Sequence, residues 1–282
     1  MATTSRGPAG VHAAFRGFRA VCAKAGVDLD KLSPQIVRRM KLLAETTETV
    51  KDCQRAAEVA QDMFRYYEKQ KPAQRFSELD QRTVVIGSLF SDIGKTGPAQ
   101  ADADGQRLIA EMFAVERVQN EKMSVNDFFT TYFADDAAQR IQRFRALGLD
   151  PAISMREFWN MHSAWTLHII QSDGIPPEAV AAAATHHLLE NVNPDSIVAH
   201  DGRFTRFFGA NERVDRPEKL VILLDKYDAA RRRAGRTHEQ AITWLRALIA
   251  KNARFGRDQE FFTLIEDLDI VMKGREALGR TR

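Results

Sequence analysis

The sequence has few cysteines, no long apolar run and no leader-like start. Its 282 residues include only two cysteines, Cys22 and Cys53, whose spacing fits neither a disulfide framework nor a cysteine-ligated zinc site. No apolar stretch approaches the roughly 20 residues that cross a bilayer, and the first ten residues lack the apolar segment of a secretion signal. We therefore expect a cytoplasmic protein with no membrane partner.

A strong excess of either charge is also missing. Basic residues number 41 and acidic residues 38, which gives a formal net charge of +3. Proteins that bind duplex DNA usually concentrate basic residues on one face, and no such concentration is visible here. This balance argues against duplex DNA as a partner and is compatible with a small phosphorylated ligand.

Regular alternation of apolar and polar residues is absent as well, so the sequence offers no convincing strand. Apolar residues recur at helical spacing from residue 11 onward, and the chain divides into helix-length segments. Ser33-Pro34 predicts the start of one long helix, or two nearly collinear ones, reaching about Lys71. Residues 191–215 are rich in Asn, Asp and Gly and predict an irregular loop. The predicted fold class is all-α.

The organisation predicted from these segments is one helical domain with a short extension. Residues 1–32 form a tail and a first helix, and residues 33–282 form the domain. Within it, residues 99–153 contain short helices separated by polar joints, which predicts a helical insertion. Aromatic residues of the insertion either pack within it or cover a cleft as a lid.

The stretch 83–98, TVVIGSLFSDIGKTGP, places an acid and a base where an apolar helix ends. If the run is a helix that ends near Ile93-Gly94, Asp92 and Lys95 share one face, and Gly94 supplies the left-handed turn that ends the helix. One interpretation is a catalytic acid and base at a cleft. The other is a solvated helix end at which the lysine lies beside the last carbonyl groups.

Three histidines and a second aspartate occupy positions where helices should face the core. His162 shares a face with apolar neighbours, His186 and His187 follow a run of alanines, and Asp225 follows an apolar turn. His168 points away from His162. Such histidines are either core residues with satisfied hydrogen bonds or metal ligands, and a buried carboxylate requires a partner. Imidazole and carboxylate together suit zinc, iron, manganese or nickel, and an ion of this kind activates water for attack on a phosphoryl group that Lys95 neutralises.

Four segments together resemble the HD superfamily of helical metal-dependent phosphohydrolases, and its HD-GYP branch in particular. They are SDIGK (91–95), MREFWNMH (155–162), AVAAAATHH (179–187) and LLDKYDAARRRAGR (223–236). The resemblance implies an HD-like helical bundle and a centre with one divalent ion. It assigns the ligands as Asp92, His162, His186, His187 and Asp225, the catalytic residues as Asp92 and Lys95, and the phosphate-binding residues as Lys95, Arg233 and Arg236.

The chain departs from the family pattern at four places. Ser91 stands where the leading histidine is expected, an upstream histidine expected near Asp52-Cys53 is missing, HHE reads HHL at 186–188, and NVNP (191–194) replaces the GYP loop. The first hypothesis is therefore a divergent phosphohydrolase or phosphodiesterase acting on a phosphorylated small molecule or nucleotide. The second is an inactive relative that binds a nucleotide or a protein partner, and the third is an iron oxygenase on the same scaffold.

Overall fold

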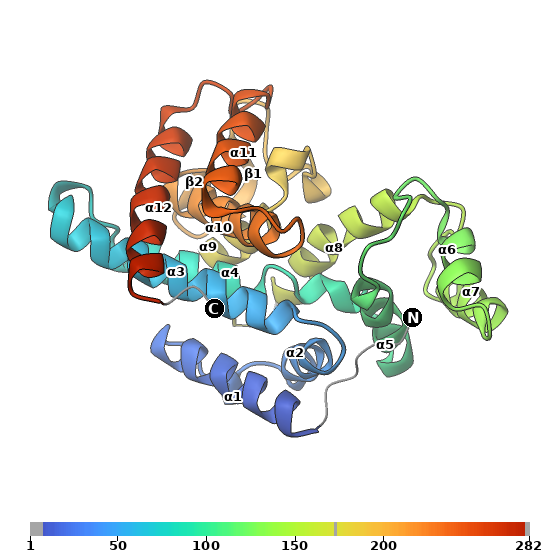
Figure 1. The fold of residues 1–282 in the computed structure, drawn as a ribbon. Helices are drawn as coiled ribbons and strands as arrows, with labels where there is room; N and C mark the ends of the chain where they lie inside the picture. The colour runs from blue at the N-terminus through green and yellow to red at the C-terminus, as the bar shows by residue number, and fades with distance from the viewer. Residues whose placement is uncertain (1–7, 172–173, 280–282) are drawn as a thin grey trace.

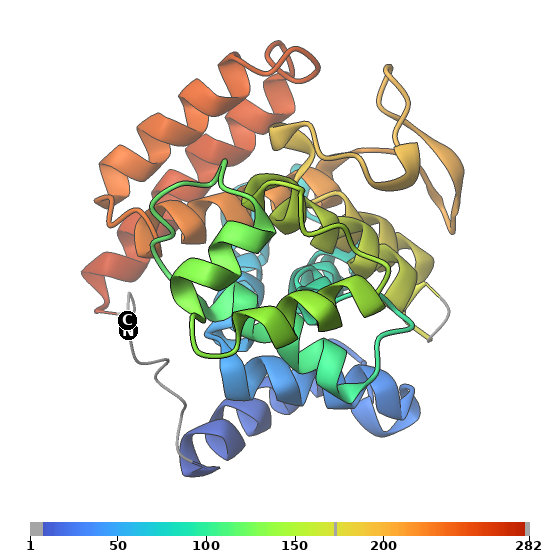
Figure 2. The same ribbon diagram turned by 90° about the vertical axis from the view of Figure 1, so that its right-hand side faces the viewer.

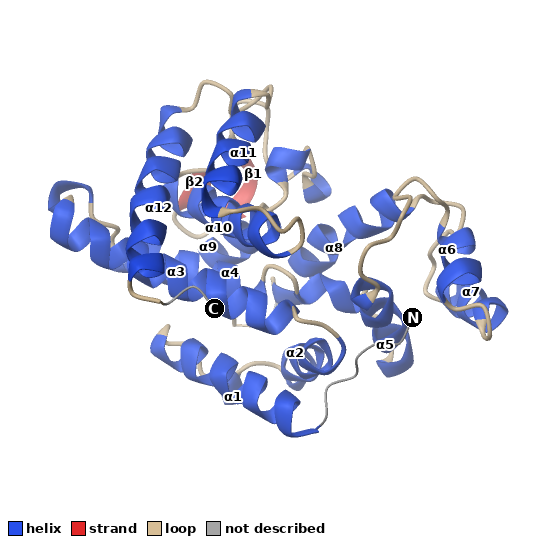
Figure 3. Cartoon of the chain, viewed as in Figure 1, coloured by secondary structure: helices blue, strands red, loops and turns tan. Residues whose placement is uncertain are grey.

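The chain is mostly helical, as predicted. The computed structural model describes residues 8–171 and 174–279, with side chains from Phe15 onward, and Figures 1 and 3 show helices throughout this part of the chain. The α-helices are α1 (Pro8–Lys24), α2 (Pro34–Thr46), α3 (Thr49–Gln70), α4 (Glu78–Phe90), α5 (Ala103–Ala114), α6 (Val125–Tyr132), α7 (Ala137–Ala146), α8 (Met155–Ile170), α9 (Pro177–Ala184), α10 (Arg216–Arg232), α11 (His238–Ala250) and α12 (Gln259–Ala277).

Helix α4 is the centre of the fold. All its residues from Thr83 to Phe90 are buried, and α3, α9 and α10 pack around it. Helix α9 approaches α4 closely because the residues in contact have small side chains or none. A Cβ atom added at Gly87 would lie 2.8 Å from the Cβ atom of Ala182. The alanine run of α9 thus allows the close helix packing that the sequence predicted, and it brings the end of α9 near the end of α4.

The region predicted as one long helix or two nearly collinear ones is two helices that cross. Helix α2 begins at the predicted N-cap Ser33 and ends at Thr46, and α3 begins at Thr49. In Figure 1, α2 is seen almost end on while α3 runs across the view, so the collinear alternative was wrong. The hydroxyl groups of Thr46 and Thr47 donate to the carbonyl oxygens of Leu42 and Leu43, a local bonding pattern that competes with helix continuation.

The prediction that the chain has no strand was also wrong. Within the loop predicted at 191–215, β1 (Arg203–Phe208) and β2 (Asn211–Arg213) pair as an antiparallel hairpin, drawn in red in Figure 3. Gly209 adopts a positive φ of 61° in the turn. Its Cα also lies against the carboxylate of Glu178, which accepts a hydrogen bond from Ala210 N at 2.8 Å, so the hairpin is held by a contact with α9.

Helices α5, α6 and α7 lie together at one side of the molecule. Figure 1 shows them on the right, and Figure 2 shows them from the front, with the other helices behind. Helix α5 packs against α2, and α8 runs from α6 toward the central helices. No helix in the described ranges combines the length and apolar character needed to cross a membrane.

Candidate metal centre

Asp92 and Lys95 lie where α4 ends, in a buried turn. Helix α4 stops at Phe90, and a 3₁₀ helix spans Ile93–Thr96. Lys95 Nζ donates to Asp92 Oδ2 at 2.6 Å, and both side chains are buried. Burial alone would raise the pKa of Asp92, but the charge of Lys95 holds it well below its usual value. Asp92 is therefore an ionised carboxylate inside the protein.

Gly94 lets α8 cross this turn at short range. Its amide donates to the hydroxyl of Thr166 at 3.0 Å, and that hydroxyl donates to the carbonyl of Ser91 at 2.8 Å. A Cβ atom at position 94 would collide with the carbonyl oxygen of His162 and lie 2.6 Å from Thr166 N. The absence of a side chain at Gly94 is what allows His162 to reach Asp92.

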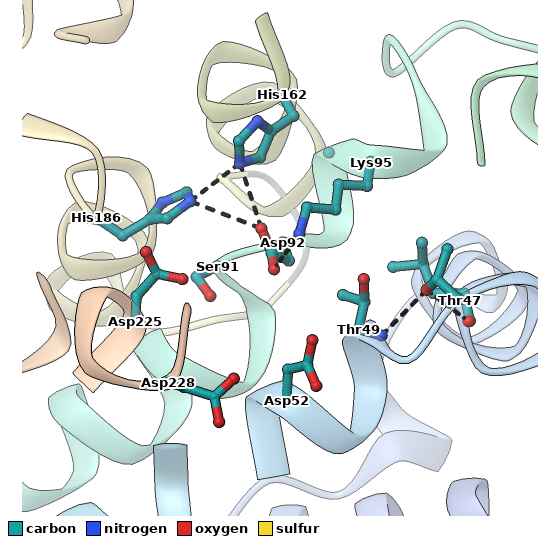
Figure 4. A network of polar contacts seen from close by, with 12 residues as sticks. Thr47, Thr49, Asp52, Ser91, Asp92, Lys95, His162, His186, Asp225 and Asp228 are labelled. Atoms are coloured by element: carbon teal, nitrogen blue, oxygen red, sulfur yellow. Dashed lines mark hydrogen bonds and ion pairs between the residues drawn. The ribbon is translucent and has the colours of Figure 1, made fainter. Parts of the chain in front are cut away.

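His162 and His186 meet Asp92 from two elements. The Nε2 atoms of the two histidines are 3.1 Å apart, and they lie 3.3 Å and 3.7 Å from Asp92 Oδ1. Figure 4 shows both rings turned toward this carboxylate oxygen, with Lys95 on its other side. His162 comes from the middle of α8, whereas His186 follows the end of α9 at Ala184. Both imidazoles are buried.

His187 completes a group of three imidazoles. One ligand atom from each of His162, His186 and His187 lies within 4.8 Å of the other two. The Nδ1 atom of His187 contacts Glu190, and Lys226 Nζ lies 2.7 Å from both that nitrogen and Glu190 Oε2. Burial, together with the charge of Lys226, lowers the pKa of His187 to about 4, and burial lowers that of His186 well below its usual value. Both imidazoles are therefore neutral near pH 7.

The hydrogen bonds on the far side of each ring determine which nitrogen carries the lone pair. His162 Nδ1 contacts the carbonyl of Trp159, and His186 Nδ1 lies 2.6 Å from the carbonyl of Ala183. A carbonyl only accepts hydrogen bonds, so both Nδ1 atoms carry the proton and both Nε2 atoms of the neutral rings carry lone pairs. His187 differs, because its Nδ1 contacts both the carboxylate of Glu190 and the ammonium of Lys226. Metal-binding histidines usually have their second nitrogen fixed by a carbonyl or carboxylate.

This arrangement fits a transition-metal ion. Two lone pairs and the ionised Asp92 Oδ1 converge within 3.7 Å with no proton between them when the rings are neutral, and a cation is the group that would stabilise such an arrangement. Neutral imidazole with carboxylate is the donor set of zinc, iron, manganese and nickel sites. His162, His186 and His187 can therefore hold a metal ion.

Asp225 lies beside the histidines. Together with Asp52 and Asp228 it lines a small cavity, and we call these three carboxylates the acidic wall. The Asp225 carboxylate pairs with Lys226 Nζ at 2.9 Å, and its side chain is 22% exposed, so it is less enclosed than Asp92. Burial would raise the pKa of Asp225, but the charge of Lys226 beside it lowers it. A cavity of about 20 Å³ separates Asp225 from Asp52, Asp228 and Ser91, large enough for roughly one water molecule.

The acidic wall is neutralised by side chains. Arg55 contacts both Asp52 and Asp228, its Nε lying 3.0 Å from Asp228 Oδ1, and Arg232 contacts the same two carboxylates. Figure 4 shows Asp52 and Asp228 facing each other below Ser91. Each carboxylate around the cavity thus has a cationic partner. The charge balance does not require a second ion on this side, and Ser91 donates its hydroxyl to the carbonyl of Ser88 at 3.2 Å.

The three predicted phosphate-binding residues, Lys95, Arg233 and Arg236, lie in three different environments. Lys95 is buried against Asp92. Arg233 is exposed, and the pKa of its guanidinium is raised because the charges of carboxylates including Asp92 and Asp225 outweigh desolvation. Arg236 instead stacks over the ring of Trp244, with Cζ 4.7 Å from the ring centroid. Of the two predicted arginines, Arg233 is the one whose pKa is raised by the charges of these carboxylates.

Sequence analysis missed Glu190 and Lys226, which orient His187. The glutamate that the family resemblance places directly after His187 is replaced by Leu188, and Glu190 follows two residues further on, at the end of HHLLE. That displaced glutamate was a visible signal. Lys226 directly follows Asp225, but its contact with His187 joins segments 39 residues apart and has no local signature.

Comparison with known proteins identifies no relative from which a function could be assigned to this site. No family model matches the chain, and no curated protein or solved structure gives a significant match. The functional argument therefore depends on the residues of the site itself.

Proposed function

We propose that this chain is a divergent, HD-like metal-dependent phosphohydrolase or phosphodiesterase that uses one ion and acts on a phosphorylated small molecule or nucleotide. The observation that supports it most is the convergence of His162 Nε2, His186 Nε2 and Asp92 Oδ1, with both histidine Nδ1 atoms engaged by carbonyl groups. His187 would be the next ligand, with Glu190 fixing its ring. The proposed ion is iron, manganese, zinc or nickel.

The ion would supply Lewis-acid chemistry and an activated water for attack on phosphorus. Asp92 would hold the ion through Oδ1, while its Oδ2 stays bound to Lys95 at 2.6 Å. This pairing favours the ionised form of Asp92. Lys95 thus stabilises the ligand set and places a positive charge beside the phosphate position.

Asp225 and Arg233 would act from the more exposed side. The lowered pKa of Asp225 makes it a weak base, so it would orient the attacking water or complete the ligand set instead of storing its proton. Arg233 is exposed and lies under the influence of the acidic wall, where its guanidinium can bind a phosphate oxygen.

Turnover of a generic phosphodiester tests this proposal. We expect wild-type protein loaded with manganese, iron, zinc or nickel to hydrolyse bis(p-nitrophenyl) phosphate, and we expect chelator treatment or His187→Ala to abolish the activity. His168→Ala is the matched control, because His168 is a half-exposed histidine on α8 that pairs with Asp195 away from the centre. Activity that survives both chelator and His187→Ala would contradict the proposal.

A catalytically inactive domain is the second candidate. It is favoured by the side chains that occupy the acidic wall: Arg55 and Arg232 neutralise Asp52 and Asp228, and the Ser91 hydroxyl is turned toward a backbone carbonyl. Such a protein would keep the metal as a structural element and bind a nucleotide or a protein partner. Stoichiometric metal without turnover on any phosphoester would support this alternative.

A further inference from the structure

A second cavity lies away from the metal centre, between the hairpin and the C-terminal helices. Its volume is about 430 Å³, within the range of small-molecule sites. Three elements form its walls: the hairpin with its flanks, the first turns of α10, and the loop between α11 and α12. The lining residues are His200, Asp201, Gly202, Arg213, Val214, Asp215, Lys219, Arg254, Phe255 and Asp258.

Two guanidinium groups on different walls of this cavity lack a carboxylate partner among the described residues. Arg213, on the hairpin, makes only a 3.5 Å hydrogen bond to the carbonyl of Asp201. Arg254, on the loop, lies 5.9 Å from the ring centroid of Phe255 and makes no side-chain hydrogen bond or ion pair within the described ranges. By contrast, Lys219 is already paired with Asp258 and Glu260. The unpaired positive charge of the cavity is therefore that of two arginines.

The wall that carries Arg254 is built before any ligand arrives. The side chain of Asn252 is buried, its Oδ1 accepts from the amides of Arg254 and Phe255 at 2.9 Å and 3.0 Å, and its Nδ2 donates to the carbonyl of Leu189 at 3.1 Å. These bonds fix the loop to the segment that follows the paired histidines. A preformed wall reduces the entropy lost when a ligand binds.

The chemistry of the lining selects a ligand class. A guanidinium fork matches a phosphate group, and two forks that line one cavity can bind one phosphate. Asp215 caps α10 and has no ion-pair partner within the described residues, so its carboxylate is free to accept from a hydroxyl group. The two apolar residues of the lining, Val214 and Phe255, are buried. The cavity thus offers little surface for a nucleobase or a lipid chain.

We propose that this cavity binds a small phosphorylated polyol, with its phosphate between Arg213 and Arg254 and its hydroxyl groups directed at Asp215. This site is separate from the metal centre, and its occupancy does not depend on the proposed hydrolytic activity.

Titration calorimetry with ribose 5-phosphate tests the assignment. Wild-type protein should bind it measurably, and both ribose and inorganic phosphate should bind at least about tenfold more weakly. Arg254→Gln and Arg213→Gln should each weaken ribose 5-phosphate binding by about tenfold or more, because each removes a charged hydrogen-bonding group. Arg257→Gln is the matched control: it removes the same charge from an exposed position of the same loop that does not line the cavity.

Three results would overturn the proposal. The first is no binding of ribose 5-phosphate to wild-type protein. The second is an equal effect of Arg254→Gln and Arg257→Gln, which would mean that only net charge matters. The third is equal affinity for inorganic phosphate and ribose 5-phosphate, which would reduce the site to an adventitious anion site. Arg213 is exposed on the hairpin, so Arg213→Gln keeps the test valid if Arg254→Gln disturbs the loop; matching unfolding midpoints verify folding of each variant.

Discussion

His162 Nε2 lies 3.1 Å from His186 Nε2, and the opposite nitrogen of each ring contacts a backbone carbonyl three residues earlier in the chain. Asp92 Oδ1 lies 3.3 Å from His162 Nε2. Imidazole binds a metal ion only through an unprotonated nitrogen, so a metal ion and a proton compete for this position.

This competition predicts how histidine substitutions act on metal binding. His162→Ala should abolish high-affinity binding of zinc or manganese, measured by calorimetry, because it removes one of three converging imidazoles. His168→Ala, six residues further along α8, should bind metal as wild type does, since His168 is half-exposed and pairs with Asp195. Equal affinities for the two variants would place the metal elsewhere or show that none is bound.

The metal-free protein should lose stability as the pH falls from about 6.5 to about 4. His187 has a pKa of about 4 in the folded protein because of burial and the charge of Lys226, against an ordinary value near 6.5. Between these values the unfolded chain takes up a proton that the folded chain does not, so the free energy of unfolding decreases by roughly 1.4 kcal/mol per pH unit.

The comparison of variants isolates this contribution. Burial raises the pKa of Glu218 to about 8, and a carboxyl group of that kind changes stability in the opposite sense over the same range. Urea unfolding with chelator present should therefore be compared between wild type and His187→Ala. Between pH 6.5 and pH 4, wild type should lose more stability than His187→Ala. The difference in the free energy of unfolding between the two proteins should therefore change steadily as the pH falls. If the free energy of unfolding depended on pH in the same way in both proteins, the lowered pKa of His187 would be refuted.

Gly94 is expected to tolerate no side chain. In Gly94→Ala the new Cβ would collide with the carbonyl oxygen of His162 and approach Thr166 N, so α8 must move away from Asp92. We expect a loss of about 2 kcal/mol or more in the free energy of unfolding, together with loss of metal binding. Gly274→Ala, at an exposed position of α12 with no atom within 4 Å, should be neutral or stabilising by up to about 1 kcal/mol. Similar stabilities for the two variants would contradict the close crossing.

Arg39 is expected to position the segment that follows Lys95. Its buried guanidinium donates to the carbonyl oxygens of Thr96, Gly97, Pro98 and Ala99, and burial lowers its pKa to about 10. Arg39→Met should cost roughly 2 to 4 kcal/mol of stability, because several buried carbonyls lose a charged donor. Arg38→Met removes the same charge from an exposed neighbour and should be nearly neutral in chemical denaturation. A nearly neutral Arg39→Met would show that this segment does not need the guanidinium.

The sequence predicted the parts of this centre that depend on local order. The apolar run before Asp92, the capping box that starts α8 at Ser154, and the alanine run before His186 each have a local pattern, and each forms a helix as predicted. The predicted helix end was wrong, because α4 ends at Phe90 and Gly94 lies in a 3₁₀ helix instead of a left-handed turn. The predictions failed where distant segments decide the conformation. The hairpin at 203–213 is held by Glu178 of α9, and this contact has no signature in the hairpin's own composition.

The neutralised acidic wall was unpredictable for the same reason. Arg55 and Asp228 are 173 residues apart, and their pairing requires α3 and α10 to lie against each other. Asp52 was recognised only as the place of a missing histidine. Its contacts with Arg55 and Arg232 depend on tertiary packing that a single sequence does not reveal.

The metal content of wild-type protein tests the central claim most directly. Protein purified without chelator and without a nickel affinity step should contain about one transition-metal ion per chain by elemental analysis, and His187→Ala prepared in parallel should contain much less. A wild-type protein that contains no metal and binds none when zinc, manganese, iron or nickel is added would contradict the account, and would make the three histidines part of the packed core.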